Sequence, residues 1–292
     1  MAARLCPYCR ELNSVGEKRC FRCGRRLPGP AADGLIRVVQ EALGADAPVT
    51  RVLLFLELLV FALCTIVELA MGHGFPLGDL GPLLGRFGGQ GSFSTSTLLR
   101  FGALGGELGR TEPWRLLSAV FVHASFFHLA MNLWVFTVLG RDLERTLGSA
   151  RFALLFLLTG VLGFVVSEWW YAPFHPVTMG ASGAVFGEIG AGVGIRRARK
   201  DRTWKSFFWS NLIYALLLSV VMGNVNTAAH LGGFAAGIGL GFAFGRERPW
   251  ARLKTLLTIA AAAGIVSVVA SVGLSMHSLV WQEVRARELR YE

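Results

Sequence analysis

The sequence predicts an all-α fold, a polytopic membrane helical bundle preceded by a small N-terminal zinc ribbon. Three observations lead to this fold class: 53% of the 292 residues are hydrophobic, only 16% are charged, and the apolar residues gather in long runs. Because a soluble domain carries about 25% charged residues, this composition argues against a cytosolic enzyme. The apolar fraction and the lack of a short repeat also exclude collagen, a coiled coil and a disordered tail.

Seven apolar runs are candidates for membrane-spanning helices. A helix needs roughly 20 residues to cross the hydrocarbon core of a bilayer. The fourth and sixth runs are shorter and rich in glycine, a composition that suits close packing between helices in a bilayer. The predicted spans are 50–71, 116–140, 151–171, 179–195, 206–222, 227–245 and 254–276.

The net charge of +10 is concentrated in three regions. Residues 1–27, 196–205 and 246–254 carry +5, +5 and +3, whereas 172–178 and 223–226 contain no Lys or Arg. Basic loops stay in the cytoplasm, so we expect a multi-pass protein, of a prokaryotic cell membrane, with its N-terminus inside and its C-terminus outside. Orientation in the bilayer accounts for the charge, and no nucleic-acid partner is expected.

Four of the five cysteines form the pattern C-x2-C-x10-C-x2-C, at Cys6, Cys9, Cys20 and Cys23. Two such pairs place four thiolates around one tetrahedral Zn²⁺, and a 27-residue unit needs the metal because it cannot bury a core. The alternatives are free thiols or disulfides, of which a cytoplasmic segment disfavours the latter. We therefore expect a structural zinc ribbon over 1–27, with an unidentified cytoplasmic partner. Residues 28–49 are either a plain linker or a short amphipathic helix at the membrane surface.

Ser182 and His230 stand at the outer starts of the fourth and sixth predicted spans. Burying a polar side chain in a bilayer costs free energy, so a polar residue there usually has a structural or functional role. Taken alone, Ser182 could be a small-residue helix contact, and His230 could be satisfied by a carbonyl. Each lies beside a stripe of glycines, however, and close packing of the two stripes would bring the hydroxyl to the imidazole, the geometry of an activated nucleophile. The stripes are Gly183, Gly187, Gly190 and Gly194, and Gly233, Gly237 and Gly241.

His128 and Asn132 lie four residues apart on the second predicted span and share one helical face. Together they could donate hydrogen bonds to a developing oxyanion, or they could form a polar contact between helices. The acid nearest to the nucleophile, Glu188, comes six residues after Ser182 and points to another face. The residues therefore favour a Ser–His dyad without a third member, and no cofactor is expected for catalysis.

These motifs resemble the rhomboid family of intramembrane serine proteases over roughly residues 50–246. The nucleophile motif G-x-S-G matches Gly180–Gly183, and A-H-x-x-G-x-x-x-G matches Ala229–Gly237. The second-span motif H-x-x-x-x-H-x-x-x-N and the Trp-Arg pair of the first loop are also present. Their residues are His123, His128, Asn132, Trp114 and Arg115.

The resemblance implies Ser182 as nucleophile, His230 as general base, and an oxyanion hole of His128, Asn132 and the Ser182 N–H. Further roles that it implies are supporting ones: Phe186 packs on the His230 ring, Gly180 keeps space beside the nucleophile, His123 holds the outer ends of helix and loop, and Trp114 and Arg115 fix the first loop.

The implied architecture is a rhomboid-like core of six transmembrane helices over 50–246, with an extra span and tail over 247–292. The implied substrates are transmembrane proteins, cleaved near the outer membrane face. Two other functions are compatible with a polytopic bundle. One is a catalytically silent rhomboid-like binder of transmembrane helices, a class that usually lacks the Ser or the His. The other is a small transporter, which is disfavoured because no inverted repeat is present.

Overall fold

The chain divides into two compact units, Met1–Pro48 and Val49–Glu292. The computed structural model describes residues 3–5, 11–14, 17–24, 27, 46–76, 91–172, 176–211, 213, 225–246 and 253–290.

Long apolar helices make up the second unit and confirm the predicted membrane helical bundle. Among the described residues, four helices are long and apolar enough to cross a membrane, and a bent pair of helices is a fifth candidate. The four are α2 (Pro48–Ala70), α7 (Ser149–Trp170), α10 (Thr227–Phe244) and α12 (Lys254–His277). Helix α8 (Ser182–Ala198) corresponds to the fourth apolar run. Residues 204–211 are helical, and most of the predicted fifth span lies outside the described residues.

The predicted span over 116–140 is a bent pair of helices and not one continuous helix. The chain forms α5 (Arg115–Ser118) and a 3-10 turn, η3 (Ala119–Phe121), and then bends by 91° into α6 (Phe126–Leu147). Val122 is extended, and the Ser125 hydroxyl caps the new helix by accepting from the His128 N–H at 3.2 Å. Apolar residues continue on both sides of the bend, so hydropathy alone does not reveal it.

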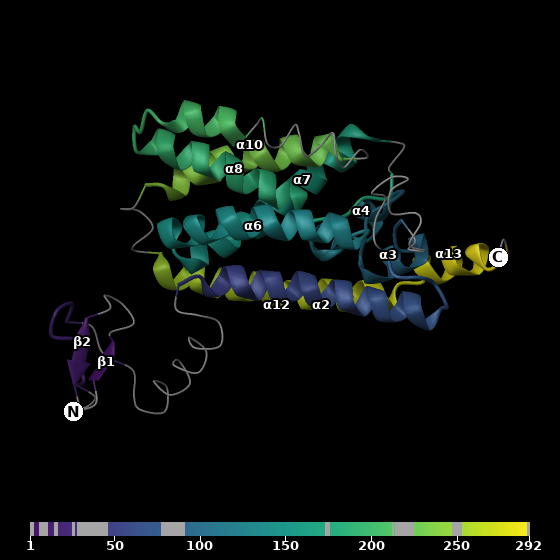
Figure 1. The fold of residues 1–292 in the computed structure, drawn as a ribbon, viewed down its shortest axis with the longest axis horizontal. Helices are drawn as coiled ribbons and strands as arrows, with labels where there is room; N and C mark the ends of the chain where they lie inside the picture. The colour runs from purple at the N-terminus through teal and green to yellow at the C-terminus, as the bar shows by residue number, and fades with distance from the viewer. Residues whose placement is uncertain are drawn as a thin grey trace. The chain divides into compact units, whose positions relative to one another are not determined.

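Three short helices at one end of the bundle were not expected from the sequence. Helices α3 (Thr95–Phe101) and α4 (Leu108–Thr111) lie in the first loop, and α13 (Val280–Glu288) follows the last span. Figure 1 shows all three at the same end of the unit. Helix α3 packs against α12 and α13, which are distant in the sequence, so local patterns do not predict this packing.

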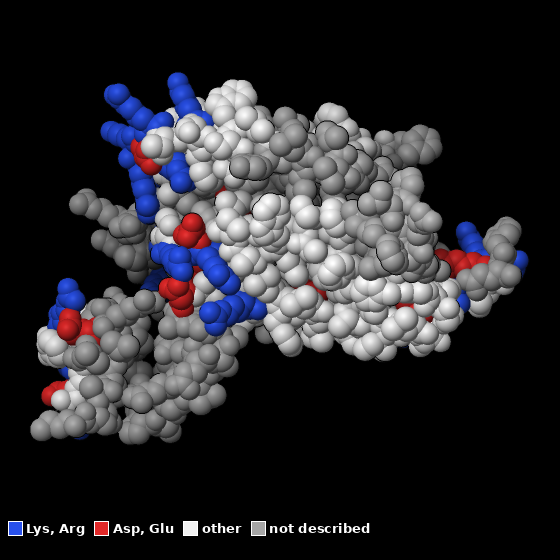
Figure 2. Space-filling model, viewed as in Figure 1, with Lys and Arg blue, Asp and Glu red and all other residues white. Residues whose placement is uncertain are grey.

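Helices α7, α8 and α10 form the tightest part of the bundle, and α6 packs against α7 and α8 (Figure 1). Aromatic rings fill the layer between α6 and α7, where the Phe136 ring lies 6.2 Å from Phe152 and 4.9 Å from Phe156. Figure 2 shows Lys and Arg gathered where α8 ends, and a broad, almost uncharged surface along the helices. This surface suits an integral multi-pass membrane protein.

The N-terminus of α2 is capped by a residue far away in the sequence. The Glu144 carboxylate, on α6, accepts from the Val49 N–H at 3.0 Å, the Thr50 N–H at 2.8 Å and the Thr50 hydroxyl at 2.7 Å. The Ser149 hydroxyl, at the start of α7, donates to the same carboxylate. One buried acid therefore connects the starts of two helices with the end of a third.

The first unit contains a two-stranded antiparallel hairpin, β1 (Ala3–Leu5) with β2 (Leu12–Ser14). Most of the predicted linker or amphipathic helix, residues 28–49, lies outside the described residues. The domain limits expected from the sequence therefore stay predictions.

Candidate active site

The structure brings Ser182 and His230 into hydrogen-bond contact. Ser182 begins α8, His230 lies in the first turn of α10, and its Nε2 is 2.8 Å from Ser182 Oγ. His230 is almost fully buried, and the ring of Phe186, one turn after Ser182, stacks on it with 4.2 Å between centroids and 9° between planes. Stacking on one face and the hydroxyl at one edge hold the imidazole in a single orientation.

The glycine stripes create this contact, as the sequence predicts. An added Cβ at Gly233 would fall on the carbonyl of Gly183, and one at Gly237 would fall on the carbonyl of Gly187. The two helices thus touch backbone to backbone, with no room for a methyl group between them. Because Gly183 follows the serine and Gly233 lies three residues after the histidine, this close packing includes the turn beside the pair itself.

Asn226 is a site residue that the sequence analysis missed. Its Oδ1 caps α10 by accepting from the Ala229 N–H at 2.9 Å. Its Nδ2 donates to Ser167 Oγ at 2.7 Å and to Thr178 Oγ1 at 2.8 Å. An Asn directly before a helical run is a recognised N-cap signal, so it could have been found. It ties the helix that carries His230 to the segment that leads to Ser182.

His128 and Asn132 line the same cavity as Ser182 and His230. Asn132 Nδ2 donates to the His128 carbonyl at 2.9 Å, and His128 Nδ1 accepts from the Ala124 N–H at 3.4 Å. In the tautomer that accepts this bond, His128 Nε2 carries the proton. An added Cβ at Gly180 would lie 2.8 Å from this Nε2, so only glycine leaves room for the imidazole beside the nucleophile segment.

Gly180 also has a backbone conformation that favours glycine, with φ of +116°. Its N–H donates to the Ala119 carbonyl at 2.8 Å, which fixes the turn just before α8. The Ser182 N–H belongs to the first turn of α8, where backbone donors have no partner within the helix. This N–H is therefore a third donor that a developing oxyanion could use.

His123 and Arg115 support the site from behind. The buried His123 ring accepts from the Ala181 N–H through Nε2 at 3.4 Å, and its centroid lies 5.1 Å from that of His128. Arg115 is fully buried and donates to the carbonyls of Leu99 and Ala103 at 2.5 and 3.2 Å. The indole nitrogen of Trp114 is buried without a hydrogen-bond partner among the described residues. The roles implied by the resemblance suit these positions for His123 and Arg115.

A cavity of about 1010 Å³ opens at the Ser182–His230 pair. Its walls come mainly from apolar side chains, and its polar lining includes His128, Asn132 and Asn226 as well as the Ser182–His230 pair. The apolar lining includes Phe93, Leu98, Trp134, Val138, Phe186 and Ile189. An apolar cavity with a few convergent polar groups is a common form of binding site.

Comparison with known proteins identifies the family. A Rhomboid domain model matches residues 110–247. The putative rhomboid protease YdcA of Bacillus subtilis is 34% identical over 137 residues, which cover 45% of this chain and 67% of YdcA. The chain belongs to the rhomboid family. Rhomboid protease GluP of the same organism is 32% identical over 173 residues, 58% of this chain and 33% of GluP. RHOMBOID-like protein 5 of Arabidopsis thaliana is 34% identical over 158 residues, 51% of this chain and 50% of that protein.

This rhomboid chain therefore spans a third of GluP and half of RHOMBOID-like protein 5. The Rhomboid domain match contains the Ser182–His230 pair, both oxyanion candidates and Arg115. It ends close to the end of α10 and includes neither the first unit, α2 nor the α12–α13 segment. Those parts are outside the family match.

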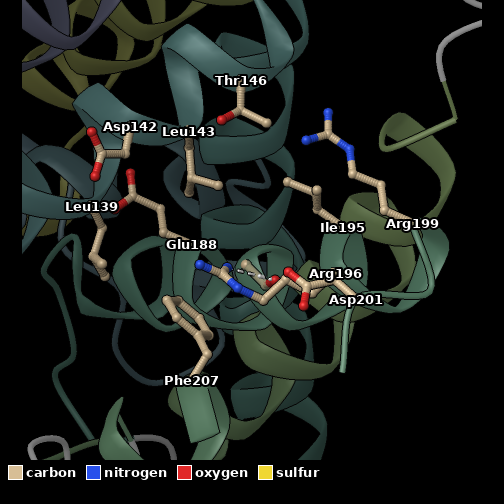
Figure 3. Close-up of a pocket in the computed structure, with 11 residues that line it drawn as sticks. Leu139, Asp142, Leu143, Thr146, Glu188, Ile195, Arg196, Arg199, Asp201 and Phe207 are labelled. Atoms are coloured by element: carbon tan, nitrogen blue, oxygen red, sulfur yellow. Dashed lines mark hydrogen bonds between the residues drawn. The ribbon is translucent and has the colours of Figure 1, made fainter. Parts of the chain in front are cut away.

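Glu188 does not reach the Ser182–His230 pair in this rhomboid. It lines a second cavity of about 210 Å³, whose other lining residues include Asp142 and Arg196 (Figure 3). The Glu188 side chain is fully buried, and both its carboxyl oxygens lack a hydrogen-bond partner among the described residues. The same holds for Glu57 on α2. Glu188 is therefore not a third member of the Ser182–His230 dyad.

We expect Glu188→Met to raise the thermal midpoint and to leave cleavage within about twofold of wild type. The substitution removes a buried carboxyl group without partners, whose desolvation costs about 1–3 kcal/mol, and keeps a similar volume. Thermal melting of the purified protein and cleavage of a transmembrane substrate measure the two effects. Glu107→Met, at an exposed position, is the control. A 100-fold loss of cleavage would contradict this account and assign Glu188 to the catalytic machinery.

The predicted zinc ligands are only half within the described part of the chain. Cys6 and Cys9 lie outside it, and among the described residues no group of three or more metal-binding side chains is present. Cys20 is buried, and the turn after it closes with the Gly24 N–H donating to the Cys20 carbonyl at 2.8 Å. Such a turn suits one half of a zinc ribbon, and the metal site stays a prediction.

Proposed function

We propose that this rhomboid is an intramembrane serine endopeptidase that cleaves transmembrane proteins near the outer membrane face. The observation that carries the proposal is the 2.8 Å contact between Ser182 Oγ and His230 Nε2 beside a large apolar cavity. A serine hydroxyl becomes a nucleophile when an adjacent base can take its proton. The relatives named as rhomboid proteases support the same activity.

The mechanism begins with proton transfer from Ser182 to His230. As the proton leaves, Ser182 Oγ attacks the scissile carbonyl carbon and forms a tetrahedral intermediate. His230 then gives the proton to the leaving amine, the peptide C–N bond breaks, and an acyl-enzyme ester remains. Water hydrolyses the ester with His230 again as the base, which restores the free serine. A helical amide is shielded, so the substrate helix must unwind locally before attack.

The oxyanion of the intermediate would be held by three donors. These are Nε2–H of His128, the side-chain amide of Asn132 and the backbone N–H of Ser182. Donors aimed at the position where charge develops lower the barrier more than they strengthen substrate binding. Gly180 supports this arrangement, because its missing side chain leaves space for His128. No cofactor takes part in these steps.

The competing function is a silent rhomboid-like protein that binds transmembrane helices without cutting them. A fluorophosphonate probe separates the two, because only an activated serine displaces its fluoride and becomes phosphonylated. We expect one labelled residue, Ser182, located by mass spectrometry of the purified protein, and no labelling of His230→Ala. An unlabelled wild-type protein that still binds a transmembrane helix would favour the silent binder.

The remaining features fit a multi-pass protein whose site faces the outer side. Basic residues gather at the end of α8, and the Ser182–His230 pair lies at the other end of the same helix. By the positive-inside rule, this arrangement supports a cytoplasmic N-terminus and an outer C-terminus. The membrane that we propose is a prokaryotic cell membrane. In the first unit, a structural Zn²⁺ would be held by Cys6, Cys9, Cys20 and Cys23. The zinc ribbon would then bind an unidentified cytoplasmic partner.

A further inference from the structure

Helix α13 and the end of α12 touch the first loop at a chain of polar contacts. We propose that this C-terminal segment, residues 275–288, is a clamp that positions both a wall of the substrate cavity and the segment that carries the nucleophile. It lies outside the Rhomboid domain match, which ends at residue 247. The inference rests on the proposed protease function for its kinetic effects, but its structural effects can be measured without it.

The first contact of the clamp is a helix cap supplied across 192 residues of sequence. The Glu288 carboxylate accepts from the Ser96 N–H at 3.1 Å and from the Ser96 hydroxyl at 2.5 Å. Ser96 lies in the first turn of α3, where backbone N–H groups lack helical partners and favour a negative charge. Arg285, one turn earlier on α13, lies 3.6 Å from the same carboxylate and orients it.

The second contact holds the other end of α3. The Arg100 guanidinium lies over the indole ring of Trp281, 4.7 Å from its centroid. The indole is itself fixed, since its N–H donates to the Met276 carbonyl at 3.1 Å. Helix α13 therefore contacts both the first and the last turn of α3. Figure 1 shows the two helices together at one end of the bundle.

The opposite side of α3 faces the substrate cavity. Phe93 precedes α3, Thr95 begins it and Leu98 lies within it, and all three line the cavity that contains Ser182. A loose α3 would move this wall. The clamp thus acts on a surface that the substrate would touch, although α13 itself contributes no residue to the cavity lining.

A third contact leads from the clamp toward the nucleophile. The Ser278 hydroxyl donates to Glu112 at 2.7 Å, and Glu112 accepts from Arg115 Nε at 2.6 Å. Arg115 in turn holds the Ala103 carbonyl. The next residue, Leu104, exchanges two backbone hydrogen bonds of 3.0 Å with Thr178, four residues before Ser182.

The two branches predict different kinetic effects. We expect Glu288→Ala to raise KM about tenfold with kcat within about twofold, because the cavity wall is loosened while the nucleophile is not. We expect Ser278→Ala to lower kcat about tenfold, because one buried hydrogen bond to a charged group contributes about 1.4 kcal/mol to the position of the nucleophile segment. Glu288→Gln keeps an acceptor for the Ser96 N–H and should restore most of the KM.

The test measures cleavage kinetics and backbone hydrogen exchange on full-length protein in the same detergent or bilayer. Residues 95–101 should exchange faster in Glu288→Ala than in wild type, while the exposed control Glu283→Ala changes neither exchange nor kinetics. The clamp is overturned if Glu288→Ala matches the control in both, or if Gln and Ala at 288 lower the thermal midpoint and activity equally. An inactive wild type would count against the protease alone, since the exchange result still tests the clamp.

Discussion

Ser182→Ala is expected to lower kcat/KM by roughly 10⁴- to 10⁶-fold, the range seen when serine proteases lose their nucleophile. The reason is the 2.8 Å contact with His230, which has no other hydroxyl partner among the described residues. His230→Ala should cost a similar factor, and the double variant should be no worse, because the two groups act as one unit. Cleavage of a purified single-span substrate in proteoliposomes measures the effect.

Ser267→Ala is a suitable control for this prediction. Ser267 lies at an exposed position on α12, and its hydroxyl donates only within its own helix, to the Ala263 carbonyl at 2.9 Å. Its loss should leave cleavage unchanged. If Ser182→Ala kept activity within tenfold of the control, the nucleophile would have to lie elsewhere and the proposed protease mechanism would be wrong.

Gly233→Ala is expected to reduce cleavage by on the order of 100-fold, although it removes no chemical group. Its Cβ would fall on the backbone carbonyl of Gly183, which cannot move as a side chain could. The two helices must separate, and displacement of reacting groups by about 1 Å can cost about 100-fold in rate. Overpacking should also destabilise the fold by about 1–3 kcal/mol. Kinetics and thermal melting report the two effects.

Gly239 provides the matched control on the same helix. An added Cβ there meets nothing within 4 Å, so Gly239→Ala should retain both activity and thermal midpoint. Fluorophosphonate labelling of Ser182 in Gly233→Ala should fall in parallel with cleavage, because the base no longer reaches the hydroxyl. Equal behaviour of the two alanine variants would show that backbone contact between α8 and α10 does not set the geometry of the pair.

The sequence predicts the main parts of the bundle because these depend on local patterns. Long apolar runs predict the long helices, and glycine stripes predict the α8–α10 contact. The bend between Phe121 and Phe126 escapes hydropathy, since apolar residues surround it. The cap from Glu288 to Ser96 joins residues 192 positions apart, which no local pattern encodes. Asn226 is different, because an Asn directly before a helical run is an N-cap signal that the sequence itself contains.

The cap that Glu144 provides has a consequence for how the protein is made. Helix α2 leaves the ribosome before α6, but the carboxylate that satisfies its N-terminal amides belongs to α6, 94 residues later. Until α6 is inserted, the backbone N–H groups in the first turn of α2 must donate to water or lipid headgroups instead. Helix α2 therefore gains its N-terminal cap only after α6 has been made, and Glu144→Ala should leave the insertion of α2 intact while slowing the packing of α2 against α6.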